Sequence, residues 1–359
     1  MQKKLIALAV AALASGAVFA QSNVSIYGAV DMGYAWRGSN MEKGVKSQQA
    51  INSNQSDASL IGFTGVEDLG NGTSALFVLE AGFKTDTGAH TNADSFFNEQ
   101  AFVGLTGGWG TAIVGRLQAP RYGFLIELDP FGDGTVGRFG NVYDDLLSVN
   151  VEKVNNAVAY VSPDFGGFTV TAAYSTNAGL LEPQESIGNV MDLETWTVFP
   201  RYANGPLDVG FVYQYVKLKN PVEFPPASGI VGGKQSQWTI GGSYDFGAVK
   251  LSAAYDHFSG KKLLEAMNDK KVKSWMLGLS APFGKNTVNF SYNESKADNL
   301  GKARQWAAGY DYSLSRRTNF YAAYSHITNK DERAASVGDA YNDGEGYRKG
   351  FQFGLRHSF

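Results

Sequence analysis

Apolar and polar residues alternate along much of this chain, most clearly at its end. Apolar or aromatic residues hold nearly every second position of the last stretch, at Tyr347, Phe351, Phe353, Leu355 and Phe359. Successive side chains of a strand point to opposite faces, so this pattern predicts a strand with different surroundings on each face. An edge strand of a soluble sandwich would fit, but a closing strand that ends on an exposed aromatic favours a transmembrane β-barrel.

The same alternation recurs about sixteen times, as in the run from Phe168 to Tyr174 and the run from Trp238 to Phe246. An even number of strands is what bacterial outer-membrane barrels use. The predicted strands start near residues 23, 57, 73, 98, 110, 154, 168, 194, 207, 236, 248, 272, 286, 303, 317 and 347.

The predicted connections alternate between short and long, as in outer-membrane barrels with short periplasmic turns and long extracellular loops. Short turns such as Gly70-Asn71-Gly72 contain the residues that tight turns require. Long connections are expected near 38–56, 85–97, 117–153, 177–193, 218–234, 258–271, 295–302 and 326–346. Tyrosines near strand ends predict aromatic girdles at both membrane interfaces, at Tyr174, Tyr213, Tyr215, Tyr244, Tyr255, Tyr292, Tyr310, Tyr312 and Tyr324.

The N-terminal residues have the composition of an export signal. Lys3 and Lys4 precede a short apolar stretch and the small residues before Ala20, so we expect a cleaved signal peptide at 1–20 and a single barrel domain at 21–359. Removing the two lysines changes the formal charge from −3 to −5, which is not typical of a nucleic-acid-binding protein. The chain has no cysteine, so disulfides do not stabilise it.

A sixteen-stranded barrel encloses a water-filled lumen, so the expected function is a diffusion channel. The longest connection, 117–153, is too long for a simple hairpin and is expected to fold inward and narrow the lumen. Its charged residues are mostly acidic and would form a negative surface there: Arg121, Glu127, Asp129, Asp133, Arg138, Asp144 and Asp145. Charged residues on the polar face of strands are the candidates for the opposite wall: Asp31, Glu80, Lys84, Arg116, Arg201, Lys250, Arg348 and Arg356.

Several motifs resemble the general diffusion porins of Gram-negative bacteria, of the Neisseria and Burkholderia type. They run in the family's order from Gln21–Asp31 through Gly65–Gly70, Leu79–Phe83, Gln100–Leu105 and Ser162–Gly166 to the terminal Phe359. The resemblance implies a homotrimer of sixteen-stranded barrels, each with its third loop folded into the lumen. It also implies that the barrel-assembly machinery recognises Phe359.

The chain departs from the family's pattern at positions that usually carry pore bases. Leu60 and Thr64 replace basic residues of the second strand, and Glu99 and Ala159 stand where further bases often occur. Arg116 remains, and Glu80 resembles a pore carboxylate of the family. With an acidic loop and few bases opposite, we expect a weakly cation-preferring or poorly selective pore, unless Leu60 adapts it to a less polar solute.

Other functions remain open at this point. A substrate-specific outer-membrane channel is the main alternative, and an outer-membrane barrel enzyme is a weaker one. The four histidines, His90, His257, His326 and His357, have no catalytic or metal-ligating spacing, so no catalytic residue, metal or cofactor is expected. The expected partners are two further copies of the chain, outer-membrane lipid and lipopolysaccharide, the barrel-assembly machinery, and small hydrophilic solutes and ions.

Overall fold

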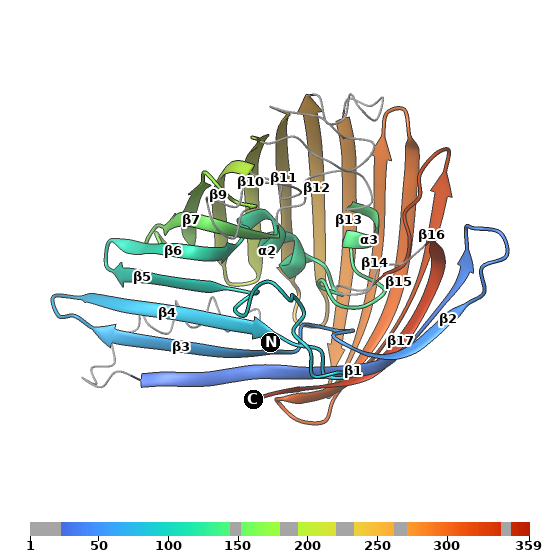
Figure 1. Ribbon diagram of the computed structural model, residues 1–359, viewed down its shortest axis with the longest axis horizontal. Coiled ribbons are helices and arrows are strands. Elements are labelled where there is room, and N and C mark those ends of the chain that lie inside the picture. Colours follow the sequence, from blue (N-terminus) through green and yellow to red (C-terminus); the bar gives the residue numbers. More distant parts are fainter. Residues whose placement is uncertain (1–22, 144–151, 180–192, 220–232, 262–270, 339–345) are drawn as a thin grey trace.

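A closed antiparallel β-barrel makes up most of the described part of the chain (Figure 1). The computed structural model describes residues 23–143, 152–179, 193–219, 233–261, 271–338 and 346–359. Its strands are β1 (Asn23–Asn40), β2 (Gln48–Ser53), β3 (Leu60–Asp68), β4 (Thr73–Gly82), β5 (Ala101–Gly107), β6 (Gly110–Gln118), β7 (Lys153–Val161), β8 (Phe168–Ser175), β9 (Leu193–Asn204), β10 (Leu207–Leu218), β11 (Lys234–Asp245), β12 (Lys250–Lys261), β13 (Lys271–Phe283), β14 (Asn286–Ala297), β15 (Gly301–Ser313), β16 (Thr318–Lys330) and β17 (Tyr347–Ser358).

The barrel closes between its first and last strands, which confirms the role predicted for the end of the chain. β1 pairs with β17 along one edge, where Tyr34 lies opposite Phe353. Along its other edge β1 pairs with both β2 and β3, so the seventeen strand segments occupy sixteen positions around the barrel. The predicted strand number is therefore confirmed. The pairing of β1 with β17 on one side and with β3 on the other closes the ladder around the barrel, which explains how a chain without disulfides is stabilised.

One expected long loop, 38–56, is instead largely a strand hairpin, because β1 continues to Asn40 and β2 pairs back onto it. The chain then leaves the sheet between β2 and β3. Asp31 holds this segment, since its carboxylate accepts hydrogen bonds from the backbone N–H groups of Gln55 and Ser56 at 2.7 and 3.2 Å. Sequence alternation alone could not reveal a strand interrupted by such a side-chain contact.

Connections gather by length at the two ends of the barrel, with one exception. The long connection expected near 295–302 is only the short turn 298–300, because β14 and β15 stay paired up to Ala297 and Gly301. Short turns at 69–72, 108–109, 162–167, 205–206, 246–249, 284–285 and 314–317 mark what we call the short-turn end. Gly205 and Gly284 adopt φ values of +56° and +60° in two of them, a conformation that favours glycine. The opposite end is the long-loop end.

The wall is polar on its inner face and apolar on its outer face, the reverse of the arrangement in a soluble protein. Gln214, Thr239 and Gln352 are almost fully buried on the inner face, whereas Ile240 and Leu277 are each 54% exposed on the outer face. Such a wall suits a barrel with lipid outside and polar contents inside. No helix among the described residues is long and apolar enough to span a membrane.

Strand length divides the wall in two. We call β3–β8, whose strands have seven to ten residues, the short wall. We call β9–β17, whose strands have twelve or thirteen, the long wall.

Candidate functional site

The segment from 119 to 143, which we call the inner loop, lies inside the barrel (Figure 1). It carries two helices, α2 (Pro120–Leu128) and α3 (Gly140–Tyr143). Pro120 begins α2, where its missing N–H group costs nothing. α2 contacts β9, β10, β11 and β12, whereas α3 contacts β14 and β15. The loop therefore narrows the lumen, as its length predicted.

Apolar packing holds α2 against the inside of the wall. Phe124, Leu125 and Leu128 are buried in one cluster with Val212 and Met276 of the long wall. The same cluster includes inward residues of the short wall at Leu76, Val78 and Ala159. The main hydrophobic core of this protein thus lies between the loop and the wall, inside the barrel.

Buried polar contacts fix the same helix. Arg121 forms an ion pair with Asp256 of β12 at 3.0 Å, and both side chains are about 5% exposed or less. The Arg121 guanidinium also donates to the hydroxyl of Thr239 at 3.2 Å. Gln237 donates to the other Asp256 oxygen at 3.3 Å, so the carboxylate is well satisfied.

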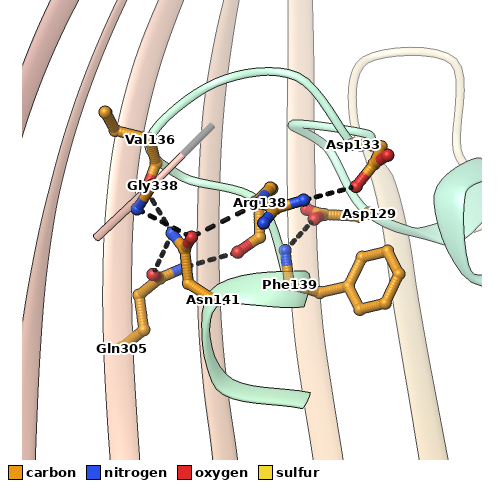
Figure 2. Close-up of polar contacts among 8 residues, drawn as sticks. All are labelled: Asp129, Asp133, Val136, Arg138, Phe139, Asn141, Gln305 and Gly338. Atoms are coloured by element: carbon orange, nitrogen blue, oxygen red, sulfur yellow. Dashed lines mark hydrogen bonds and ion pairs between the residues drawn. The ribbon is translucent and has the colours of Figure 1, made fainter. Parts of the chain in front are cut away.

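The remainder of the inner loop is held by the hydrogen bonds drawn in Figure 2. Asp129 joins two parts of the loop, because its carboxylate accepts from the N–H groups of Phe131 at 3.0 Å and Phe139 at 2.6 Å. Asn141 donates to Gln305 of β15 at 2.9 Å and accepts from the N–H of Gly338 at 3.0 Å. A described part of the last long connection therefore also reaches into the lumen and packs on the inner loop.

The acids of the inner loop are engaged within the protein. Glu127 forms an ion pair with Arg201 of β9 at 2.5 Å, and Asp133 forms one with Arg138 at 3.2 Å. Asp129 is satisfied by backbone N–H groups, as described above. Asp144 and Asp145 lie outside the described residues. The negative surface expected from counting acids is thus absent from the described loop, because its carboxylates already have cationic or N–H partners.

Two predicted wall carboxylates, Asp31 and Glu80, face inward and are nearly fully buried. Asp31 accepts from the Tyr321 hydroxyl at 3.0 Å, in addition to the backbone contacts given above. Glu80 accepts from Tyr27 at 2.7 Å and from Gln100 at 3.0 Å. Both carboxylates therefore stabilise the wall by hydrogen bonds on its inner face.

Leu60 and Thr64 also lie on the inner face of β3, opposite Ala29 and Ser25 of β1. Both are partly buried. Thr64 donates its hydroxyl to the Phe77 carbonyl at 3.1 Å. The two positions therefore border the lumen without a charge.

Arg116 lies on the outer face of β6. It pairs with Ala101 and follows the exposed Val114 by two positions. Its guanidinium donates to the Asn98 carbonyl at 2.9 Å. This placement contradicts the expected position at the constriction. The sequence misled because both faces of β6 are apolar: Leu117, on the inner face, packs in the loop cluster.

Sequence reasoning missed a charged pair where the inner loop rejoins the wall. Lys153 begins β7 and forms an ion pair with Glu99 at 3.0 Å, while its ammonium lies 5.6 Å from the Tyr122 ring centre. Burial and the nearby Asp133 carboxylate raise the pKa of the preceding Glu152 to about 7. The sequence feature that could have identified Glu152 and Lys153 was their position at the end of the longest connection.

A cavity of about 410 Å³ lies between the inner loop and the short-turn end. Lys250, Arg316 and Arg317 line it, together with many hydroxyl groups. In the described part of the chain, no carboxylate forms an ion pair with these three bases. Arg356 also lines the cavity but is paired with Asp57 at 2.7 Å. The acids Glu127, Asp129 and Asp311 line it as well, and Asp311 accepts from Asn289 at 2.8 Å.

Comparisons with known proteins agree with this architecture. A family model for Gram-negative porins matches residues 7–332. The chain is 32% identical to outer membrane porin protein 32 of Delftia acidovorans, with all of both chains covered. It is 29% identical to major outer membrane protein P.IB of Neisseria lactamica, again over both whole chains.

Solved structures show the same fold. An anion-selective porin from Comamonas acidovorans aligns with a TM-score of 0.77 and 28% identity, over 94% of this chain and all of that one. OmpT of Vibrio cholerae in its trimer form aligns with a TM-score of 0.68 and 15% identity, over 94% and 99% of the two chains, and shares the fold alone. The anion-selective relative opposes the cation preference expected from the sequence.

Proposed function

The chain belongs to the Gram-negative porin family, and from this premise we propose that it forms a water-filled channel for passive diffusion of ions and small hydrophilic solutes, with a preference for anions. Its location is the outer membrane, and porins are channels, not enzymes. The single observation that carries the proposal is an inverted barrel wall whose lumen is narrowed by the inner loop.

The charges along the lumen support the anion preference. Glu127 and Asp133 of the inner loop are neutralised by arginines, whereas Lys250, Arg316 and Arg317 of the cavity have no carboxylate partner among the described residues. Unpaired bases at a narrow passage raise the local concentration of anions. The anion-selective relative points in the same direction.

Planar bilayers with a salt gradient test this proposal. We expect a reversal potential of the sign given by anion preference, reduced several-fold in the double variant Lys250→Gln/Arg317→Gln. Lys43→Gln, in an exposed connection far from the cavity, is the matched control and should behave as the unaltered protein. A cation-selective unaltered channel would contradict the proposal.

Liposome swelling separates a general channel from the substrate-specific alternative. For a general channel, the swelling rate should fall smoothly as neutral sugars become larger. A single sugar that permeates far faster than others of its size would favour the specific channel.

We also propose that the protein is a homotrimer whose subunits meet through the short wall. The outer face of the short wall presents exposed apolar side chains at Val103, Leu105 and Val114. Its strands are shorter than those of the long wall, which suits a surface covered by protein.

Phe359 is proposed as the signal that the barrel-assembly machinery recognises. Its backbone completes the seam through two hydrogen bonds with Gly28, at 3.0 and 3.1 Å. The ring is 43% exposed on the outer face, and a side chain at Gly28 would collide with it. The aromatic ring is thus accessible at the strand where closure occurs.

A further inference from the structure

The sheet next to β1 is interrupted between β2 and β3 by residues 54–59, which we call the stop segment. This segment leaves the sheet beside Asp31, because β1 pairs with β2 on one side of this residue and with β3 on the other. Its side chains Asn54, Gln55 and Ser59 are completely buried. Burying polar groups costs free energy unless hydrogen bonds satisfy them, so the segment must be held by specific contacts.

Three neighbouring strands of the wall hold the stop segment. Oδ1 of Asp31 on β1 accepts hydrogen bonds from two backbone N–H groups of the segment and from the hydroxyl of Tyr321 on β16. Asp57 of the segment forms its ion pair with Arg356 of β17. The other Asp31 oxygen, Oδ2, has no hydrogen-bond partner in the described part of the chain. The segment is therefore fixed to the wall at the seam, and Oδ1 of one carboxylate makes the central contacts.

The inner loop rests on the stop segment at Gly134. The loop backbone approaches the Ser56 carbonyl so closely there that a Cβ atom added to Gly134 would collide with it. Two positions further along, the N–H group of Val136 donates to Oε1 of Gln352 on β17 at 2.6 Å. The inner loop thus runs from α2, which packs on β9–β12, to the seam between β17 and β1, where the stop segment supports it.

This contact lies beside the open part of the lumen. Ser56 and Asp57 of the stop segment line the cavity below the inner loop, together with Asp129 and Gly132 of the loop. Groups in van der Waals contact cannot approach further, so the loop cannot move toward the wall here unless the stop segment moves first. The position of the loop at Gly134 therefore decides how much of the lumen stays open to solutes.

We propose that the stop segment sets the width of the channel, with Gly134 as its contact on the inner loop and Asp31 as the positioning residue. Asp31 is completely buried, so it acts on permeation through the segment that it holds and does not touch the solute. Glycine is required at position 134 because any side chain there would displace the loop from its support. The inference rests on the proposed channel function and identifies what fixes the size limit of that channel.

The first test alters the contact itself in the full protein. Gly134→Ala should push the loop away from the wall and lower the single-channel conductance about twofold in planar bilayers. In liposome swelling, the largest neutral sugars that the unaltered protein admits should be excluded. Gly123→Ala, in α2 of the same loop, is the matched control, because its added Cβ atom would lie 3.8 Å from the Gln118 side chain, an ordinary contact. Conductance and sugar limit unchanged in Gly134→Ala would overturn the proposal.

The second test alters the positioning residue and also decides the matter should Gly134→Ala fail to assemble. Asp31→Asn keeps an oxygen that accepts the same hydrogen bonds and should retain the conductance, whereas Asp31→Ala releases the stop segment and should give channels of variable conductance with a higher sugar limit. A purely structural role would lower the amount of folded Asp31→Ala protein while the assembled channels conducted normally, and that result would overturn the positioning role. An unaltered protein that does not conduct would instead refute the channel proposal, so the two failures can be distinguished.

Discussion

Short-wall strands contain seven to ten residues and long-wall strands twelve or thirteen. At about 3.3 Å per residue, the long-wall strands extend roughly 40 Å, and several short-wall strands less than about 30 Å. A hydrocarbon core is about 30 Å thick and barrel strands are tilted. A tilted barrel strand needs about 9–11 residues to cross a bilayer, so every long-wall strand exceeds this length, whereas the short-wall strands only reach it or fall short of it.

The two walls also differ in what covers each face. The long wall separates a polar interior, with Gln214 and Gln305, from an apolar exterior. The short wall has apolar residues on both faces, because Leu76 and Val78 pack inward against the inner loop while Val103 and Leu105 point outward. One continuous sheet can thus serve as a boundary with lipid along the long wall and as a packing surface along the short wall.

The most severe way to break this arrangement is to open the seam where the walls join at β1. Deleting Phe359 removes two backbone hydrogen bonds to Gly28 and the proposed assembly signal, so we expect folded protein in the outer membrane to fall by about an order of magnitude or more. The amount of folded protein is measured from its heat-modifiable mobility on gels. Arg356→Ala, three positions before Phe359, should assemble normally and change only conduction. Unchanged levels after the deletion would refute the proposed signal.

The contrast between the walls explains what could be predicted from the sequence. Alternation is clean in the long wall, since Trp238 and Ile240 face lipid while Thr239 faces the lumen, and there the strands were predicted well. In the short wall both faces are apolar, so the facing of Arg116 was predicted wrongly. Hydropathy indicates what surrounds a side chain. It cannot show on which face of a strand the side chain lies when both faces are apolar.

The electrostatics of the lumen were harder to predict for another reason. The length of connection 117–153 was enough to predict that it folds inward. Its charge count was not enough to predict selectivity, because Glu127 is neutralised by Arg201, which lies 74 positions away on β9. The Asp256 partner of Arg121 lies 135 positions away. Such pairings depend on the closed barrel and leave no local pattern in the sequence.

The attachment of the inner loop to the long wall can be broken at its buried ion pair. Asp256→Ala leaves the Arg121 guanidinium buried without its partner, and we expect a loss of about 3–5 kcal/mol in the free energy of unfolding. Single-channel recordings should also show greater current noise, because α2 is less firmly held. Arg121→Met/Asp256→Leu should recover much of the stability, and an equally large loss in that double variant would contradict the explanation.

A matched pair of substitutions compares the outer faces of the two walls directly. Val103 of the short wall and Leu277 of the long wall are each 54% exposed. Leu277→Arg places a charge against lipid and should cost about 2–4 kcal/mol near the membrane midplane while the trimer persists. Val103→Arg should instead dissociate the trimer on native gels. Trimers that survive Val103→Arg but not Leu277→Arg would place the subunit contact on the long wall.

The smallest expected effect concerns Glu152, where the inner loop rejoins the short wall. Burial and the nearby Asp133 carboxylate raise the pKa of Glu152 to about 7, well above the ordinary carboxyl value of about 4.3. Between these values the folded protein retains a proton that the unfolded chain has released, so this group makes stability fall as pH rises through that window. Above it the lumen gains one negative charge.

Anion preference, measured as the reversal potential under a salt gradient, should therefore decrease modestly as pH rises from about 6 to about 8. Glu152→Gln should remove this dependence and hold the channel at the more anion-preferring value, whereas Glu42→Gln, in an exposed connection, should leave it intact. If the pH dependence persisted in Glu152→Gln, a different group would have to carry the titrating charge. The selectivity of this pore would then be set away from the junction of the inner loop with the short wall.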